Sequence, residues 1–169
     1  MGVGTRRCAV DTNFLIDLAS ETPAAQGLLG LLQGARFSVI ATHTVLHEAG
    51  GIAQAPRKKA HAEAIIALQN LRDWQITAID LIPVGHGICS EFAGNLIKKG
   101  LLPNDEFHDG LIVAEAALAG AAFLISSDAH LAEIPPGDLK VALAAADLGS
   151  VDVVKPRNFF NALRARQLK

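Results

Sequence analysis

The sequence predicts an α/β protein, in which helices cover both faces of a mainly parallel central sheet to form a three-layer α/β/α sandwich. Segments typical of short buried strands alternate with segments of helical periodicity, which is the pattern of parallel β-α-β units. Half of the 169 residues are hydrophobic, with only seven Phe, one Trp and no Tyr. This composition suits helices packed on a buried sheet. The length fits one domain, residues 1–169, with a substantial core.

The N-terminal part of the chain contains two predicted strands, each followed by helix. Residues 7–11 (RCAVD) form the first strand, and a helix follows at about 12–18. A second helix, at 24–34, ends at a glycine, as helices commonly do. Residues 37–41 (FSVIA) are typical of a buried strand, and the helix after them carries Glu48.

The middle of the chain begins with a basic amphipathic helix that we expect to open at Pro56. Apolar residues recur there at helical spacing from Ala60 to Leu71. Residues 76–82 are typical of a strand. The helix after this strand is expected to end near residues 98–100 (KKG), because cations in the last turn followed by a glycine favour termination.

The C-terminal part repeats the alternation. A helix at about 106–119 leads into a strand at 122–126 (AFLIS), and a short helix then begins at Asp128. Residues 135–137 (PPG) are expected to form a loop. A final strand at 151–154 precedes a terminal helix opened by a proline.

Neither a membrane segment nor a secretion signal is expected. The longest apolar stretch, residues 110–125, contains Glu115 and is shorter than the roughly 20 residues that cross a bilayer, so it predicts a buried helix running into a buried strand. The first ten residues lack the long apolar run of a signal peptide. Cys8 and Cys89 match no zinc or redox spacing. These features favour a reduced, cytoplasmic setting.

Four acidic residues stand out by their places relative to these elements. Asp11 and Asp128 lie at the C-terminal ends of predicted strands, where parallel sheets form their binding crevice. Each also has an ordinary structural explanation, since Asp11 and Asp128 suit helix N-caps and Asp109 suits a first helical turn. Glu48 lies in a weakly polar segment, where it is either on a solvated helix face or buried, and a buried carboxylate needs a partner or a cation.

The four acids would repel one another strongly if they shared one crevice. At an effective dielectric of ~20 and separations of ~5 Å, each pair costs roughly 3 kcal/mol. Such a cluster persists only by taking up protons or by binding a cation. All-oxygen ligation favours a hard ion, Mg²⁺ or Mn²⁺, over zinc.

The motifs around these acids are similar to those of the PIN domain family. The resemblance rests on VDTNFLID at the start, VLHEAG around Glu48, DGLIVAEA from Asp109 and LISSDAHL around Asp128. The late segment VVKPRNFFNAL resembles the closing strand and helix of VapC-like, toxin-type PIN proteins. The match covers nearly the whole chain and is weakest at residues 53–101.

The resemblance implies an endoribonuclease that uses Mg²⁺ or Mn²⁺ to hydrolyse RNA to products with a 5′-phosphate and a 3′-hydroxyl. It implies that Asp11, Glu48, Asp109 and Asp128 are both the metal ligands and the catalytic acids. Asn13 and Ser127 fall where PIN domains place polar residues that support the acids. The resemblance further implies the toxin of a toxin–antitoxin pair, with a small antitoxin protein as partner and a homodimer as the assembly.

Several nearby residues have two interpretations each. Asp105, four residues before Asp109, is either an N-cap or an auxiliary acid on the same helix face. Three histidines, His47, His108 and His130, lie within two residues of a proposed ligand. They are either an acid–base pair or simply polar residues at a crevice.

The charge of the chain does not decide whether it binds RNA. The formal net charge is −2, and leaving out the four proposed ligands gives −2 + 4 = +2. Basic residues at 57–59, and Arg164 with Arg166, either contact phosphate or are solvated. The chain has no P-loop, no GxGxxG and no GxSxG elbow, so no nucleotide cofactor is expected.

Two other functions compete with cleavage of RNA. One is a catalytically silent PIN domain that binds RNA or protein, although all four acids are present. The other is a haloacid-dehalogenase-like phosphatase, because that chemistry also begins with an Asp at a strand end. It normally requires a second Asp two residues later, where this chain has Asn13.

Overall fold

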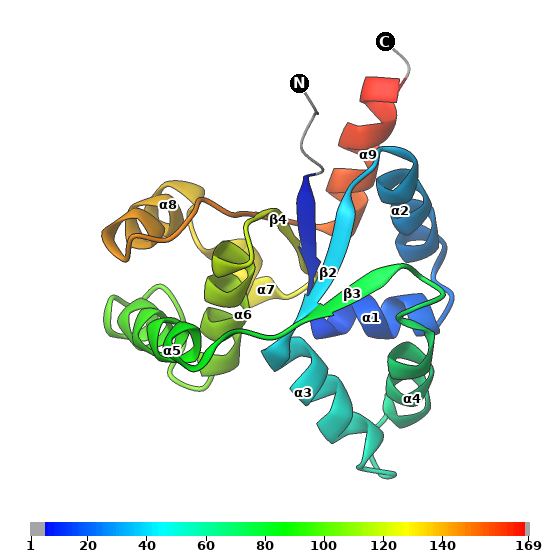
Figure 1. Cartoon of the computed structure of the whole chain (residues 1–169), viewed down its shortest axis with the longest axis horizontal. Helices are drawn as coiled ribbons and strands as arrows, with labels where there is room; N and C mark the ends of the chain where they lie inside the picture. Colours follow the sequence, from blue (N-terminus) through cyan, green and yellow to red (C-terminus); the bar gives the residue numbers. More distant parts are fainter. Residues whose placement is uncertain (1–5, 168–169) are drawn as a thin grey trace.

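A computed structural model describes residues 6–167 and contains one five-stranded sheet in that range (Figure 1). The strand order is β3-β2-β1-β4-β5, and every neighbouring pair is parallel. The strands are β1 (Arg7–Val10), β2 (Ser38–Thr42), β3 (Ile76–Ile79), β4 (Ala121–Ile125) and β5 (Asp152–Val154). The predicted α/β fold with a parallel sheet is confirmed.

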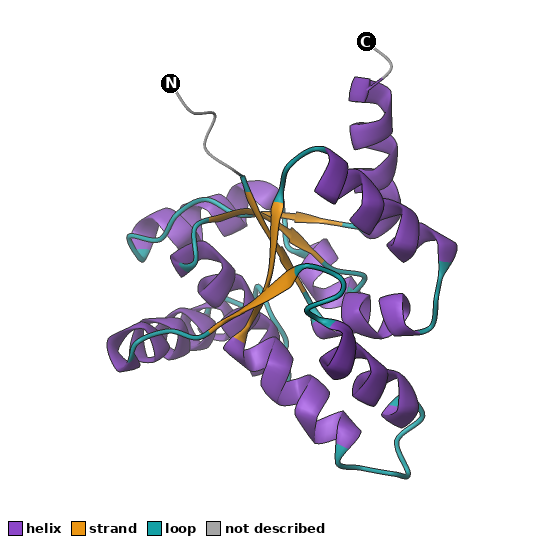
Figure 2. Cartoon of the chain, turned by 45° about the vertical axis from the view of Figure 1, so that its right-hand side comes forward, coloured by secondary structure: helices purple, strands orange, loops and turns teal. Residues whose placement is uncertain are grey.

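Helices cover both faces of this sheet (Figures 1 and 2). Helices α1, α2, α4 and α9 lie on one side, and α5, α6 and α8 lie on the other, while α3 extends from the end of β2. Their bounds are α1 (Thr12–Ala19), α2 (Pro23–Gly34), α3 (His43–Ala53), α4 (His61–Asn70), α5 (Pro83–Lys98), α6 (Phe107–Leu118), α7 (Ala129–Glu133), α8 (Pro136–Ala145) and α9 (Pro156–Gln167). The three layers therefore agree with the sequence prediction.

The strand order fixes where a binding crevice can form. From β1 the chain moves outward through β2 to β3, and it then returns to add β4 and β5 on the opposite side of β1. The connections therefore diverge at the C-terminal ends of β1 and β4, which is the topological switch point of an open parallel sheet. Val10 pairs with Ile125 in this register, so Asp11 and Ser126 leave the sheet side by side.

The two helices that cover this end pack closely against each other. A Cβ atom added to Gly110 on α6 would lie only 2.7 Å from the Cβ of Ala93 on α5. Only a glycine allows this approach, since real Cβ atoms do not come so close. Gly110 directly follows Asp109, so the same contact fixes the position of that acid relative to the sheet.

The apolar stretch at 110–125 has the predicted form. It runs through α6, whose residues are buried from Ile112 to Ala117, and enters β4. Within residues 6–167, no helix is long and apolar enough to span a bilayer. The prediction that the first ten residues are no secretion signal lies partly outside the described residues, which begin at residue 6.

Two sequence predictions about helices are wrong. Residues 135–137 were expected to form a loop, but Pro136 is the first residue of α8, a position where its fixed φ and missing N–H are tolerated. Pro56 does not open a helix, because residues 56–60 form successive turns and α4 begins at His61. One turn is closed by the N–H of Lys58, which donates to the carbonyl of Ala55 at 2.9 Å.

Candidate active site

The four predicted acids line one hollow at the switch point of the sheet. The hollow has a volume of about 400 Å³, and Asn13, Lys58 and Glu106 also line it. We call the group formed by Asp11, Glu48, Asp109 and Asp128 the acidic cluster. These acids come from four separate segments, namely the ends of β1 and β4 and the helices α3 and α6.

Asp11 is held rigidly at the end of β1. Its Oδ1 accepts from the backbone N–H of Phe14 at 2.7 Å, which caps α1, and its Oδ2 accepts from the Ser126 hydroxyl at 2.5 Å. The residue is only 4% exposed. Burial raises the pKa of Asp11 to about 6, helped by the charge of Asp128 and opposed by both hydrogen bonds. The N-cap interpretation of Asp11 is confirmed, and the same residue also lines the hollow with the other three acids.

Asp109 is the member of the cluster with the least compensation. Among the described residues, its buried Oδ2 atom has no hydrogen-bond partner. Burial, together with the charges of Asp128, Glu106, Glu48 and Asp11, raises the pKa of Asp109 to about 7. An ionised carboxylate in this place needs a proton or a cation to be stable.

Glu48 is oriented by two side chains from other elements. Its Oε2 accepts from the Thr12 hydroxyl at 2.5 Å, and its Oε1 lies 3.2 Å from Nδ1 of His108. The glutamate side chain is 24% exposed, so it reaches the open part of the hollow. Glu48 therefore connects α3 to α1 and α6.

A buried acid outside the cluster fixes the start of α3. Glu115 on α6 is 1% exposed, and its two carboxylate oxygens accept from the backbone N–H and the hydroxyl of Thr44, at 3.0 and 2.6 Å. This contact satisfies a free N–H group in the first turn of α3. Because Glu48 lies one turn further along α3, the contact also sets the distance between Glu48 and α6.

Ser126 connects the two strand-end acids. It donates to Asp11, and its Oγ accepts from the backbone N–H of Asp128 at 3.0 Å. Asp128 in turn caps α7, because its Oδ1 accepts from the N–H of His130 at 2.7 Å. Sequence reasoning proposed the neighbouring Ser127, which is exposed, and its supporting role stays a prediction.

The donor types at this hollow suit a hard divalent cation, although no three of the four carboxylates bring ligand oxygens within 4.8 Å of one another. All four donors are carboxylates, Asp109 keeps an unpartnered buried oxygen within the described chain, and the pKa values of Asp11 and Asp109 are both raised. A cation placed among them would reverse the repulsion that raises these pKa values. Oxygen-only ligation favours Mg²⁺, Mn²⁺ or Ca²⁺ over Zn²⁺.

Solved structures provide the comparison that bears on the fold. A chain in the crystal structure of VapBC2 from Rickettsia felis, bound to a DNA fragment from their promoter, superposes with a TM-score of 0.62 at 16% identity. The match covers 88% of this chain and 98% of that chain. The chain's fold is PIN-like. A chain of DNA-bound VapBC from Salmonella typhimurium gives a TM-score of 0.59 at 12% identity, covering 90% of this chain and 99% of that one.

At these identities the likeness concerns the fold and not the activity. No family model matches the sequence, and no curated protein sequence matches it. The resemblance found in the sequence motifs is thus supported by the PIN-like arrangement of strands and helices. The roles of individual side chains depend on the geometry of this site.

Glu106 is a site residue that sequence reasoning missed. It lines the hollow, its charge contributes to the raised pKa of Asp109, and its Oε1 lies 3.4 Å from Nε2 of His130. Asp105, which was considered as an N-cap or an auxiliary acid, is exposed, and the residue at the N-cap of α6 is Glu106. The spacing of three residues between Glu106 and Asp109 was the available signal.

The basic residues are divided between the two ends of the PIN-like fold. Lys58, in the turns between α3 and α4, lines the acidic hollow. Arg164 and Arg166 lie in the last turn of α9, at the same end of the molecule as the start of β1 and away from the cluster (Figure 1). Lys58 is therefore the basic residue placed to meet a phosphate beside the acids.

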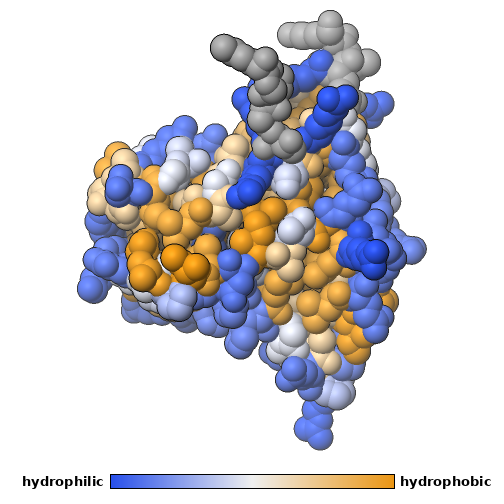
Figure 3. All heavy atoms as spheres, in the orientation of Figure 1, coloured by the Kyte–Doolittle hydropathy of each residue, from blue (hydrophilic) through white to orange (hydrophobic). Residues whose placement is uncertain are grey.

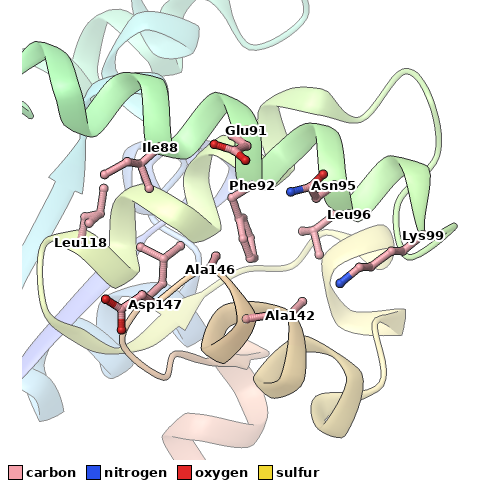
Figure 4. A pocket seen from close by; sticks show the side chains of 12 residues that line it. Ile88, Glu91, Phe92, Asn95, Leu96, Lys99, Leu118, Ala142, Ala146 and Asp147 are labelled. Atoms are coloured by element: carbon pink, nitrogen blue, oxygen red, sulfur yellow. The ribbon is translucent and has the colours of Figure 1, made fainter.

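A separate hollow of about 440 Å³ lies between α5, α6 and α8 (Figure 4). Phe92 and Leu96 of α5 face Ala142 of α8 across it, and Leu118 of α6 lies at one side. Figure 3 shows hydrophobic surface over this part of the molecule. None of the four acids, all of which the structure describes, lines this hollow.

Proposed function

We propose that the chain is a metal-dependent endoribonuclease, a single PIN-like nuclease domain that hydrolyses phosphodiester bonds of RNA. The observation that carries the proposal is the unpartnered, buried Oδ2 of Asp109, in the described chain, beside three further carboxylates. Such an arrangement is poorly stable without a cation and well suited to holding one. The PIN-like fold supports the proposal at the level of architecture.

Asp11, Glu48, Asp109 and Asp128 would hold Mg²⁺ or Mn²⁺. When bound, such an ion makes a neighbouring water more acidic and stabilises the negative charge that develops on the phosphate. Asp11 contributes a fixed carboxylate, because Ser126 and the N–H of Phe14 hold both of its oxygens. Glu48 is oriented by Thr12 and His108, and Asp109 offers the oxygen that is free within the described chain.

The contacts of Asp11 argue against the phosphatase alternative. A nucleophilic aspartate must present an oxygen to phosphorus, whereas both oxygens of Asp11 accept hydrogen bonds and the residue is 4% exposed. The position two residues later holds Asn13, which lines the hollow but cannot serve as a general acid. Hydrolysis without a covalent intermediate agrees better with this geometry.

The surroundings of the cluster and the comparisons support proposals for the substrate and for the partner. Lys58 offers a cation for a substrate phosphate at the rim of the hollow. Both similar structures are VapBC complexes bound to DNA, and this supports a small antitoxin as partner, with the chain as the toxin. We further propose a homodimer acting in the cytoplasm.

Cleavage assays on single-stranded and hairpin RNAs test the proposal. We expect cleavage with Mg²⁺ or Mn²⁺, none with EDTA, and products with a 5′-phosphate and a 3′-hydroxyl. The Asp11→Asn variant should fold, since Asn also caps helices well, and should be inactive. Cyclic phosphate products, or equal cleavage by the variant, would contradict the proposal. Metal binding without cleavage of any RNA would indicate the silent binding module instead.

A further inference from the structure

A second group of titratable side chains lies at the same edge of the sheet, outside the acidic hollow. We call His43, Asp80 and His86 the histidine cluster. His43 is the first residue of α3, after β2, Asp80 directly follows β3, and His86 lies in the first turn of α5. Figure 1 shows the chain leaving β3 and passing beside the start of α3 on its way to α5.

The three side chains already converge on one point. Oδ1 of Asp80 lies 2.9 Å from Nε2 of His86 and 3.4 Å from Nδ1 of His43. One ligand atom from each residue lies within 4.8 Å of the other two. Ligands of a tetrahedral ion with bonds of about 2.0–2.1 Å lie about 3.3 Å apart, so only small side-chain movements separate this arrangement from a coordination shell.

We propose that the histidine cluster binds a borderline-soft divalent transition metal ion, Zn²⁺ being the type example, at a second site separate from the acidic cluster. Two imidazole nitrogens and one carboxylate oxygen are a donor set typical of zinc, and three protein ligands leave a fourth position open. The acidic cluster offers only carboxylates and favours hard ions. The two sites therefore select different metals.

The charge state and the exposure of the side chains in the histidine cluster both favour metal binding. The N–H of Leu81, then His86 and His43, hold the pKa of Asp80 below its ordinary value, so this carboxylate is ionised at neutral pH. His43 and Asp80 are exposed and His86 is partly exposed, so an ion can enter from solvent. The cluster opens onto a hollow of about 220 Å³ that His47 and His108 also line.

The N-terminal ends of α3 and α5 carry partial positive charge, which opposes the binding of a cation here. They also suggest another explanation for why the three side chains lie together. Asp80 lies at the N-termini of both helices, where a carboxylate is favourable by itself. In that case His43 and His86 would only be hydrogen-bond partners of an anionic cap. The two explanations make different predictions for metal binding. Only a metal site requires a lone pair of each imidazole to point at one ion.

Cobalt(II) titration of the full chain distinguishes a metal site from an anionic cap. Four-coordinate Co²⁺ with nitrogen and oxygen ligands absorbs visibly more strongly than the six-coordinate ion. We expect one equivalent of Co²⁺ to give this spectrum, Zn²⁺ to displace it, and excess Mg²⁺ to leave it unchanged. Repeating the titration on Asp109→Asn keeps the test independent of the acidic cluster and of RNA cleavage, and the spectrum should persist there.

Single substitutions identify the ligands. His43→Gln, Asp80→Asn and His86→Gln should each weaken Co²⁺ binding by roughly 10- to 100-fold or more, while His61→Gln, a histidine on α4, should leave it unchanged. The three cluster side chains are at least partly exposed, so circular dichroism and the Tm in EDTA should match the wild type. No four-coordinate spectrum in the wild type, or unchanged binding in all three variants, would overturn the metal site in favour of an anionic cap.

Discussion

The acidic cluster and the histidine cluster lie at the same edge of one sheet, yet they differ in burial and in the way their charges are balanced. The acidic cluster follows β1 and β4, where the direction of the sheet connections reverses, and it encloses a hollow. The histidine cluster follows β2 and β3, is more exposed, and joins one carboxylate to two imidazoles. Of these two clusters, only the acidic one contains a buried carboxylate oxygen, Oδ2 of Asp109, that has no hydrogen-bond partner among the described residues.

This difference indicates which cluster depends on a cation. In the histidine cluster the carboxylate of Asp80 already has both imidazoles as close partners, so a metal would bind to side chains that already lie together. The acidic cluster consists of like charges in a partly buried place, so its ionised form is costly until a cation binds. Unfavourable interactions of this kind are common where a site is selected for activity.

The largest expected effect comes from neutralising the unpartnered acid. Asp109→Asn should lower RNA cleavage by at least about 100-fold, because a ligand is lost. The same change should raise the Tm of the metal-free protein at pH 8 by a few degrees, because it removes a repelled charge. Asp105→Asn, an exposed residue in the loop before α6, is the matched control and should change neither quantity. Loss of activity together with loss of stability would indicate a merely structural role.

The second-largest expected effect is a loss of stability when the contact between Glu115 and Thr44, which positions Glu48, is removed. Glu115→Ala should lower the free energy of unfolding by about 2–4 kcal/mol, because the N–H and hydroxyl of Thr44 lose their partners. Glu115→Gln should cost less, since an amide oxygen still accepts one bond. Urea unfolding measures both, with the exposed Glu91→Ala as control. Equal stability of Glu115→Ala and Glu91→Ala would contradict the proposed positioning.

A third prediction concerns the pH dependence of stability in EDTA. The folded-state pKa values of Asp11 and Asp109 are raised from 3.8 to about 6 and about 7, so the folded state prefers their protonated forms. The stability that they contribute is present below about pH 4 and is lost as the pH rises through 6 and 7. Thermal unfolding between pH 4 and 8 measures this loss, and Mn²⁺ should reverse it above pH 7. A flat profile would show that these charges are compensated in another way.

The smallest effects concern the histidines around the acids. His108→Asn removes one of the two groups that orient Glu48 and should lower cleavage roughly 10-fold. His47→Asn should have little effect, because the His47 ring stacks on His43 and makes none of the contacts to the acids described above. Single-turnover rates at saturating Mn²⁺ distinguish the two. Equal losses would indicate that both histidines act through a shared property such as RNA affinity.

The separation between the clusters can be tested in the same assay. His86→Gln should leave Mn²⁺-dependent cleavage within about two-fold of the wild type, since His86 makes none of the contacts described above that orient the four acids. It should still abolish the four-coordinate Co²⁺ spectrum. If cleavage falls in step with Co²⁺ binding, the two clusters form one functional unit and the comparison fails.

Much of the fold could be predicted because it follows from local patterns. Short apolar runs gave the five strands, and strand ends marked Asp11 and Asp128. The helix α8 was missed because Pro135, Pro136 and Gly137 resemble a loop, whereas Pro136 is tolerated as a first helical residue. The Ala-rich segment after it was the stronger signal.

The details of the site could not be predicted, because they depend on register and on helix phase. Ser126 rather than Ser127 contacts Asp11 because Val10 pairs with Ile125, and no local pattern fixes the register between strands so far apart in sequence. Glu106 rather than Asp105 faces the hollow because of the direction in which the chain enters α6. Glu115 was taken as an interruption of an apolar stretch, since its partner Thr44 lies on another helix.

The most direct test of the central claim is to locate Mn²⁺ in crystals of the protein by its anomalous scattering. The account predicts a peak within coordination distance, about 2.0–2.3 Å, of Oδ2 of Asp109, with other members of the acidic cluster around it. The peak should be absent in Asp109→Asn and present in Asp105→Asn. Crystals saturated with Mn²⁺ that show no peak in the hollow, or a peak unaffected by Asp109→Asn, would contradict the account.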